Sequence, residues 1–188
     1  MSTRKPMTLV DRLIAPGATR GEVAAGFGTA AAGAVLALFL AVDAHLPALA
    51  VVVVVVIAFD LFGGAVVNAT GSAKRWFHRP GRTAVHHLGF VTAHVHPFVL
   101  ALTVPGFGWT TAAATYGAVL AGAVLVEFAP AGLRQPVAFA VTALALTAVL
   151  GLAPAPAAVA WFGPLLMIKL LLAHLLPADQ SGAGLHLP

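Results

Sequence analysis

The chain of 188 residues contains no cysteine and few charged side chains. Without cysteine it can form no disulfide, no thiolate nucleophile and no metal site with cysteine ligands. Charged residues make up 9% of the sequence, whereas an ordinary soluble domain carries roughly 25%. So few charges cannot cover a water-facing surface, and the composition therefore excludes a typical soluble domain.

Apolar residues, by contrast, are abundant and arranged in long runs. They make up 60% of the sequence, and the mean hydropathy is +0.97. Six runs have about the 20 residues that a helix needs to cross a bilayer. They cover residues 22–42, 47–69, 84–104, 109–128, 136–153 and 157–176. The sequence predicts an all-α polytopic membrane protein with six transmembrane helices. A single domain, residues 22–176, lies between a basic arm, residues 1–21, and a short tail, residues 177–188.

Nine of the ten Lys and Arg residues lie on one side of this topology. They are Arg4, Lys5, Arg12, Arg20, Lys74, Arg75, Arg79, Arg82 and Arg134. The connections on the other side carry only Asp43. Because basic loops stay in the cytoplasm, we expect a multi-pass protein of the cell membrane with N- and C-termini cytoplasmic. The basic loops would contact the head groups of membrane lipids, so the pI of 10.4 does not require a nucleic-acid partner.

Polar side chains are concentrated in residues 59–97. Asp60 lies within an apolar run, and Asn68 follows it. After a basic connector come four histidines, His86, His87, His94 and His96. Burying polar groups costs free energy unless they are paired, and ionisable residues within membrane spans usually serve function. We therefore expect this stretch to form the functional site.

The predicted topology places further polar residues at the same depth. Spans two, three, four and six bring polar groups into the cytoplasmic half, where Glu127, Lys169 and His174 join the groups of residues 59–97. The outer half has almost none. This one-sided distribution predicts a polar cavity that opens to the cytoplasm.

Helical geometry indicates which of these residues share a face. His87 and His94 are seven positions apart, about 20° from alignment in an α-helix, so we expect them to share a pocket. His96 would then face elsewhere. Pro97 lacks a backbone donor, which predicts a kink near Ala93 and a role for His96 in bonding a freed carbonyl.

These positions suggest a catalytic set and a metal set. The predicted catalytic residues are Asp60, Asn68, His87 and His94, with Glu127 and Lys169 behind them. Imidazoles and carboxylates suit zinc or non-haem iron, and the candidate metal ligands are His86, His87, His94, Asp60 and His174. We expect a membrane-embedded enzyme, with Zn or Fe as candidate cofactor, that acts on a lipid or another apolar substrate. Without a metal, Asp60 and His94 would form an acid–base pair.

Two other functions stay open at this point. Intramembrane Asp, His, Glu and Lys also line proton and ion pathways, so the chain could be a proton, ion or small-solute transporter. Alternatively, His87 or His94 could face His174 across a haem or pigment. A structural subunit of a membrane complex, or a homo-oligomer, would pack through the Gly- and Ala-rich first and fifth spans.

Overall fold

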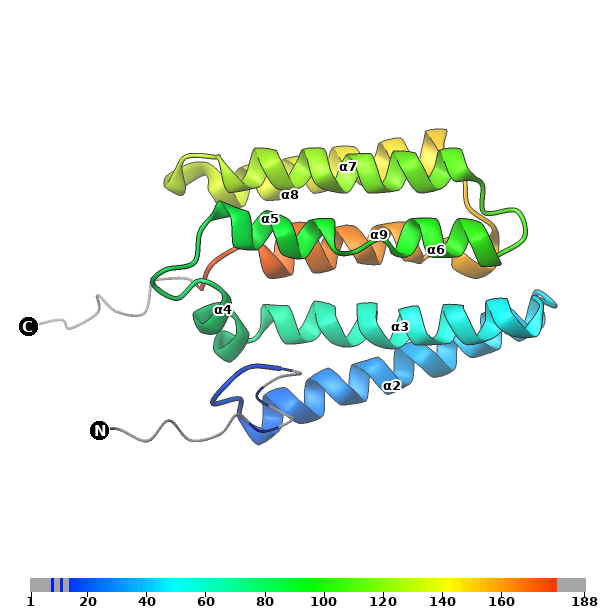
Figure 1. Cartoon of the computed structure of the whole chain (residues 1–188), viewed down its shortest axis with the longest axis horizontal. Helices are drawn as coiled ribbons and strands as arrows, with labels where there is room; N and C mark the ends of the chain where they lie inside the picture. Colours follow the sequence, from blue (N-terminus) through cyan, green and yellow to red (C-terminus); the bar gives the residue numbers. More distant parts are fainter. Residues whose placement is uncertain (1–7, 9–10, 12–13, 179–188) are drawn as a thin grey trace, which may run out of the picture.

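A computed structural model describes residue 8, residue 11 and residues 14–178. In this part of the chain all regular structure is helical, and six segments are long and apolar enough to span a membrane (Figure 1). The predicted all-α class is thus confirmed, and the six segments that are long and apolar enough to span a membrane agree in number with the prediction. The predicted arm and tail lie mostly outside the described residues.

The spans differ in detail from the six uninterrupted runs of the sequence. The first, second and fourth are single helices: α2 (Arg20–Asp43), α3 (Ala48–Ala69) and α7 (Trp109–Glu127). The third consists of α5 (Ala84–Thr92) and α6 (His96–Thr103). The fifth joins the short 3-10 helix η1 (Ala131–Leu133) to α8 (Arg134–Leu152). The sixth contains the 3-10 turn η2 (Ala157–Val159), α9 (Phe162–Met167) and a π-helix, η3 (Ile168–His174).

Helix α2 begins at a capping box. The hydroxyl of Thr19 accepts a hydrogen bond from the backbone N–H of Glu22, and the Glu22 carboxylate accepts one from the backbone N–H of Thr19. Such reciprocal bonds satisfy donors that a helix start leaves free. The Glu22 carboxylate also accepts from the hydroxyl and the N–H of Ser72 in α4 (Gly71–Phe77). The start of α2 is therefore tied to the connector that follows α3.

Small residues let α2 and α3 lie close together along their length. A Cβ on Gly26 would lie 2.8 Å from Val67, and one on Gly33 would overlap the ring of Phe62. A Cβ on Gly63 would lie 2.8 Å from the Cβ of Ala30. Inside a bilayer, burial of apolar surface from water contributes little to the association of helices. Helices associate there through the van der Waals contacts that such close approach allows.

The third span is interrupted where the sequence predicts a kink. Helix α5 ends at Thr92, and Ala93 is its C-cap. Pro97, which has no backbone N–H, lies at the start of α6. The hydroxyl of Tyr116 in α7 donates to the carbonyl of Thr92 at 2.7 Å. A side chain from a neighbouring helix thus satisfies a carbonyl at the break.

The sixth span occupies the centre of the bundle. Leu166, Met167, Leu170 and Leu171 are fully buried. This span packs against α3, α7 and α8. Its π-helical part, η3, carries Lys169 and His174, both buried. Short π-helical segments occur frequently at functional sites.

The start of α2, the helix α4, the turn before α8 and the end of η3 lie at one end of the bundle (Figure 1). The basic residues of the described connections gather there, and we call it the basic end; they are Arg20, Lys74, Arg75, Arg79, Arg82 and Arg134. The turns between α2 and α3, α6 and α7, and α8 and η2 form the opposite end. The one-sided charge of the sequence is therefore reproduced in the arrangement of the helices.

Candidate functional site

Asp60 of α3 and Lys169 of η3 form an ion pair between helices. Lys169 Nζ donates to Asp60 Oδ2 at 2.6 Å and to the backbone carbonyl of Asp60 at 3.3 Å. The lysine side chain is 3% exposed and the aspartate side chain 47%. Gly64 makes this possible, because a Cβ there would lie 2.5 Å from Lys169 Cε. Glycine at this position thus leaves room for the lysine side chain.

His96 is the histidine nearest to Asp60, and the expectation that it faces elsewhere is wrong. Its Nε2 lies 3.8 Å from Asp60 Oδ2. That expectation assumed an unbroken helix with a constant turn per residue. The break after Thr92 resets the helical phase, so α6 begins at His96 with its imidazole directed at α3.

His94, and not His96 as the sequence predicted, bonds to a carbonyl that the break leaves free. Its backbone N–H bonds to Val91 rather than Phe90, and its Nδ1 lies 2.7 Å from the Phe90 carbonyl. In a continuous helix the N–H of residue 94 would satisfy that carbonyl. His94 therefore closes the break with its side chain, and its ring contacts that of His96 at a centroid distance of 5.4 Å.

A second polar cluster lies towards the basic end. His87 Nδ1 is 3.2 Å from both carboxylate oxygens of Glu127, and its Nε2 is 3.2 Å from the Phe77 carbonyl. Arg134 donates to the carbonyl of Glu127 at 2.9 Å. Both ring nitrogens of His87 are therefore engaged, and the expected pocket shared by His87 and His94 does not form.

His78 and His174 complete this second cluster. The ring of His78 lies 4.6 Å from that of His87, and its Nε2 is 2.9 Å from the His174 carbonyl. Burial lowers the pKa of His78 below its ordinary value of 6.5, against the opposing effect of the bond to that carbonyl. His78 is therefore held in its neutral form. The neutral imidazole donates to the carbonyl from Nε2.

His174 is buried, and its imidazole is stacked on Phe90 at a centroid distance of 4.1 Å. Within the described part of the chain, neither of its ring nitrogens has a hydrogen-bond partner. Phe90 also contacts His94, at 4.7 Å. This phenylalanine thus separates the group around Asp60 from the group around His87.

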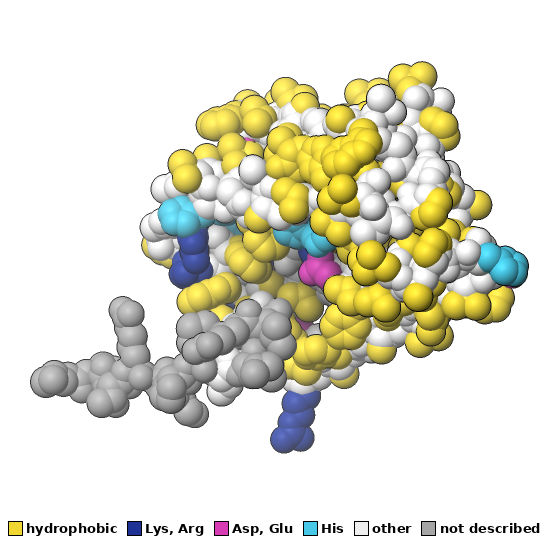
Figure 2. All heavy atoms as spheres, turned by 45° about the vertical axis from the view of Figure 1, so that its right-hand side comes forward, with side chains coloured by type: hydrophobic (Ala, Val, Ile, Leu, Met, Phe, Trp, Pro, Cys, Tyr) yellow, Lys and Arg dark blue, Asp and Glu magenta, His cyan; other side chains and the backbone are white. Residues whose placement is uncertain are grey.

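A cavity of about 460 Å³ runs from Asp60 towards the basic end. Asp60, Asn68 and Lys169 all contribute to its wall. Aromatic side chains form much of the remaining lining: Phe27, Phe59, Trp76, Phe77 and Phe90. Figure 2 shows an acidic side chain beside a histidine in a depression of an otherwise hydrophobic face. His87, His94 and Glu127 are not part of this wall.

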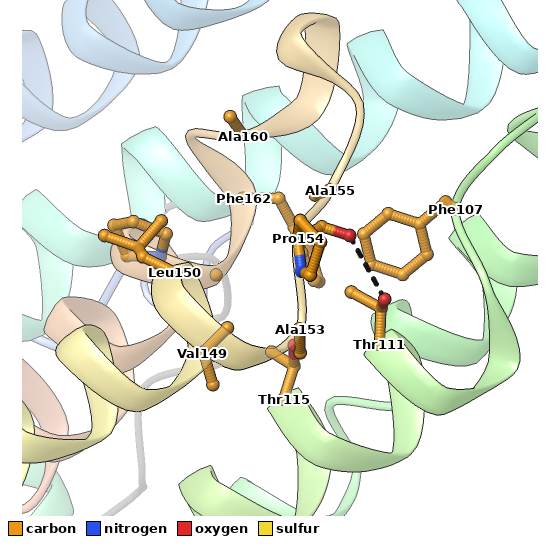
Figure 3. Close-up of a pocket in the computed structure, with 12 residues that line it drawn as sticks. Phe107, Thr111, Thr115, Val149, Leu150, Ala153, Pro154, Ala155, Ala160 and Phe162 are labelled. Atoms are coloured by element: carbon orange, nitrogen blue, oxygen red, sulfur yellow. Dashed lines mark hydrogen bonds between the residues drawn. The ribbon is translucent and has the colours of Figure 1, made fainter.

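The opposite end has a smaller and almost wholly apolar pocket. Figure 3 shows it between the turn before α7 and the turn after α8. Its volume is about 160 Å³. Thr111 Oγ1 donates to the carbonyl of Pro154 at 3.2 Å. This bond occupies the threonine within the protein, and no ionisable side chain lines the pocket.

The metal set of the sequence is not assembled. No three His, Asp or Glu side chains of the described residues are placed to hold one ion. The proposed ligands have separate partners: Asp60 pairs with Lys169, His87 with Glu127, His94 with Phe90 and His86 with Thr83. His174 is the remaining member, and its ring packs against Phe90. The expected zinc or iron site is therefore not formed by these side chains.

Sequence reasoning missed two members of these clusters, His96 and His78. The signal for His96 was the proline that follows it, which resets the helical phase. His78 lies in a basic connector, where histidine is usually a surface residue, and only the fold of α4 brings it beside His87.

Comparisons with protein families, with curated proteins and with solved structures found no match to this chain.

Proposed function

We propose that this protein is an enzyme of the cell membrane that carries out acid–base chemistry on a lipid or another apolar substrate. In this proposal the six spans cross the bilayer, and the basic end with both termini faces the cytoplasm. The observation that carries the proposal is the ion pair of Asp60 and Lys169 in the wall of an aromatic cavity. Ionisable groups at such a depth are expensive, which argues against an incidental role.

The side chains suggest distinct roles. Lys169, held against α3, donates to Asp60 Oδ2 at 2.6 Å and fixes the orientation of the carboxyl group. The half-exposed Asp60 carboxylate would accept a proton from the substrate as a general base. His96, 3.8 Å from Asp60, would exchange that proton. It replaces His94 as the imidazole of the acid–base pair, since His94 bonds to Phe90.

The wall of the cavity suits an apolar substrate. Phe27 and Phe59, with ring centroids 6.4 Å apart, line the cavity and are each more than one third exposed. A substrate dissolved in the bilayer would therefore enter beside them, between the helices. Aromatic and aliphatic walls with few polar groups are typical of small-molecule sites.

Expression followed by analysis of membrane extracts tests this proposal. Cells carrying the wild type, Asp60→Asn or the surface variant Asp43→Asn would be compared by mass spectrometry of their lipids and apolar metabolites. We expect at least one compound class to change with the wild type and with Asp43→Asn, and to stay unchanged with Asp60→Asn. Identical extracts from all three strains, with equal amounts of folded protein, would refute the proposed activity.

A second candidate is a proton-coupled transporter, and the alignment of the histidines favours it. The rings of His96, His94, Phe90, His174, His87 and His78 follow one another at centroid distances of 5.4, 4.7, 4.1, 6.0 and 4.6 Å. Phe90 carries no group that takes up or releases a proton, so protons could move among the histidines on each side of it, and passage from Asp60 to the basic end would need a water molecule beside this ring. Acidification of liposomes that contain the purified protein would distinguish this function from an enzyme, which needs no path through the opposite end.

The alternative of a haem held by His87 and His174 has less support. Iron needs a free ring nitrogen on each histidine, and both nitrogens of His87 are engaged by Glu127 and Phe77. An absorption spectrum of the purified protein without a Soret band would agree with this argument.

A further inference from the structure

The ion pair at the cavity is asymmetric, and the acidic partner is the accessible one. Lys169 is 3% exposed and directs its Nζ at two oxygens of Asp60, whereas the Asp60 side chain is 47% exposed. Oδ2 faces both Lys169 and His96. No donor from the described residues bonds to Oδ1. A substrate that reaches this site therefore meets a carboxylate oxygen with unused acceptor capacity.

A second polar group of the cavity also lacks a partner. Asn68 lies two helical turns from Asp60 on α3, about 12 Å along the axis, and is 4% exposed. Its Nδ2 has no hydrogen-bond partner in the part of the chain that the structure describes. Buried amide donors are nearly always bonded, so this donor indicates a bound molecule. Asp11, a second carboxylate, also lines the cavity.

We propose that the cavity binds an amphiphile whose head group donates a hydrogen bond, a hydroxyl or a protonated amine, to Asp60 Oδ1. This inference rests on the proposed function, because it names the substrate class of the same site. A carboxylate only accepts hydrogen bonds, and the aromatic wall holds the apolar part of the ligand. An ionised fatty acid offers only acceptor oxygens, which cannot bond to Asp60 Oδ1. Asn68 would donate to an oxygen farther along the ligand.

The fluorescence of Trp76 can report the binding of a ligand without any turnover. It lines the cavity, whereas Trp109 and Trp161 do not. The protein in nanodiscs of zwitterionic lipid would be titrated with dodecanol, dodecylamine and dodecanoate, three probes with equal chains. The same titrations of Trp76→Phe and of empty nanodiscs measure the part of the fluorescence change that does not arise at the cavity. We expect a saturable change with the alcohol, the amine or both, and at least ten-fold weaker binding of dodecanoate.

The carboxylate is tested by Asp60→Asn, and by Asp60→Asn combined with Lys169→Met should the single variant fail to fold. Either variant should weaken binding of the preferred probe at least ten-fold. Preference for the amine identifies a cationic head, and preference for the alcohol a neutral one; both support the inference. Equal or tighter binding of dodecanoate, or unchanged affinities in the variants, would overturn it.

The outcomes separate this inference from the proposed activity. Selective binding that depends on Asp60, together with membrane extracts that do not change, leaves the ligand class standing and refutes the enzyme. Altered extracts together with preferred binding of dodecanoate leave the enzyme standing and refute the ligand class.

Discussion

The side chain of Lys169 fills the space that a side chain at Gly64 would need. A Cβ on Gly64 would lie 2.5 Å from Lys169 Cε and 2.7 Å from its Nζ. The glycine is one helical turn from Asp60 on α3, so the lysine crosses α3 where no side chain stands between it and the carboxylate. Glycine at this position is therefore a requirement of the ion pair.

Replacing Gly64 with leucine should destabilise the protein and break the pair. Overpacking of this kind costs about 1–3 kcal/mol, and the displaced lysine would lose its bonds to Asp60. Gly64→Ala should cost less, because the end of the lysine side chain is flexible. Thermal unfolding in detergent measures both effects.

Gly89→Ala is the matched control for this substitution. Gly89 also lies within a helix, α5, but a Cβ there would meet no atom within 4 Å. Alanine is the better helix former by roughly 0.5–1 kcal/mol, so this variant should be as stable as the wild type or slightly more so. Equal stability of Gly64→Leu and Gly89→Ala would show that Lys169 does not depend on the glycine.

Loss of either partner of the ion pair should have unequal effects. Asp60→Asn leaves the buried ammonium of Lys169 without its counter-charge, whereas Lys169→Met leaves a half-exposed carboxylate. Removing one partner of a buried pair costs about 3–5 kcal/mol, so we expect Asp60→Asn to approach that loss and Lys169→Met to cost less.

The double variant Asp60→Asn with Lys169→Met should recover most of the stability, because neither charge is left alone. Unfolding curves of the two single variants and the double variant form a complete thermodynamic cycle. Additive losses in the double variant would mean that the two side chains do not stabilise one another.

The depth of the polar residues could be predicted from the sequence, but their pairing could not. Hydropathy and loop charge set the number of spans and the level of each residue along them. These two properties alone predict the levels of Asp60, Asn68 and Lys169. Pairing depends on which helices are neighbours. The sixth span packs against α3 and supplies the partner of Asp60, Lys169, although the two lie 109 positions apart in the chain.

The contacts of the histidines are the second feature that the sequence could not predict. An unbroken helix places His87 with His94, and the proline indicates only that a kink occurs nearby. How far the chain turns at the break depends on which side chains satisfy the freed carbonyls. Tyr116 bonds the carbonyl of Thr92, and His94 bonds that of Phe90. Neither bond can be read from helical spacing.

The protein should lose stability in mild acid in part through His78. Burial lowers the pKa of His78 below 6.5 in the folded protein. Below about pH 6.5 the unfolded chain then binds more protons than the folded one, so the free energy of unfolding falls as the pH drops. His78→Gln retains a donor for the His174 carbonyl but does not titrate. Its melting temperature should fall less than that of the wild type between pH 7.5 and pH 5.5.

The exposed His45, at the opposite end, is the control for this comparison. His45→Gln should show the same pH dependence as the wild type. Parallel curves for the wild type and His78→Gln would contradict the expected contribution of His78.

The proposed orientation can be tested by thiol labelling, because the chain has no cysteine of its own. Cysteines at Asp43 and Pro105, in exposed turns of the opposite end, should react with an impermeant reagent applied outside intact cells. A cysteine at Pro80, exposed at the basic end, should react only after lysis. Ser72 is unsuitable because it is buried and bonded to Glu22. Labelling of residue 80 in intact cells would invert the topology.

The ion pair joins residues that are 109 positions apart, and its basic member lies in the last span. At the usual rate of translation, about 5–20 residues per second, Lys169 is synthesised roughly 5–20 s after Asp60. If the spans cross the bilayer as proposed, the first five are therefore synthesised with an acidic group that still lacks its basic partner. Chains that stop before the sixth span would keep this unpaired aspartate, which is costly in surroundings of low polarity.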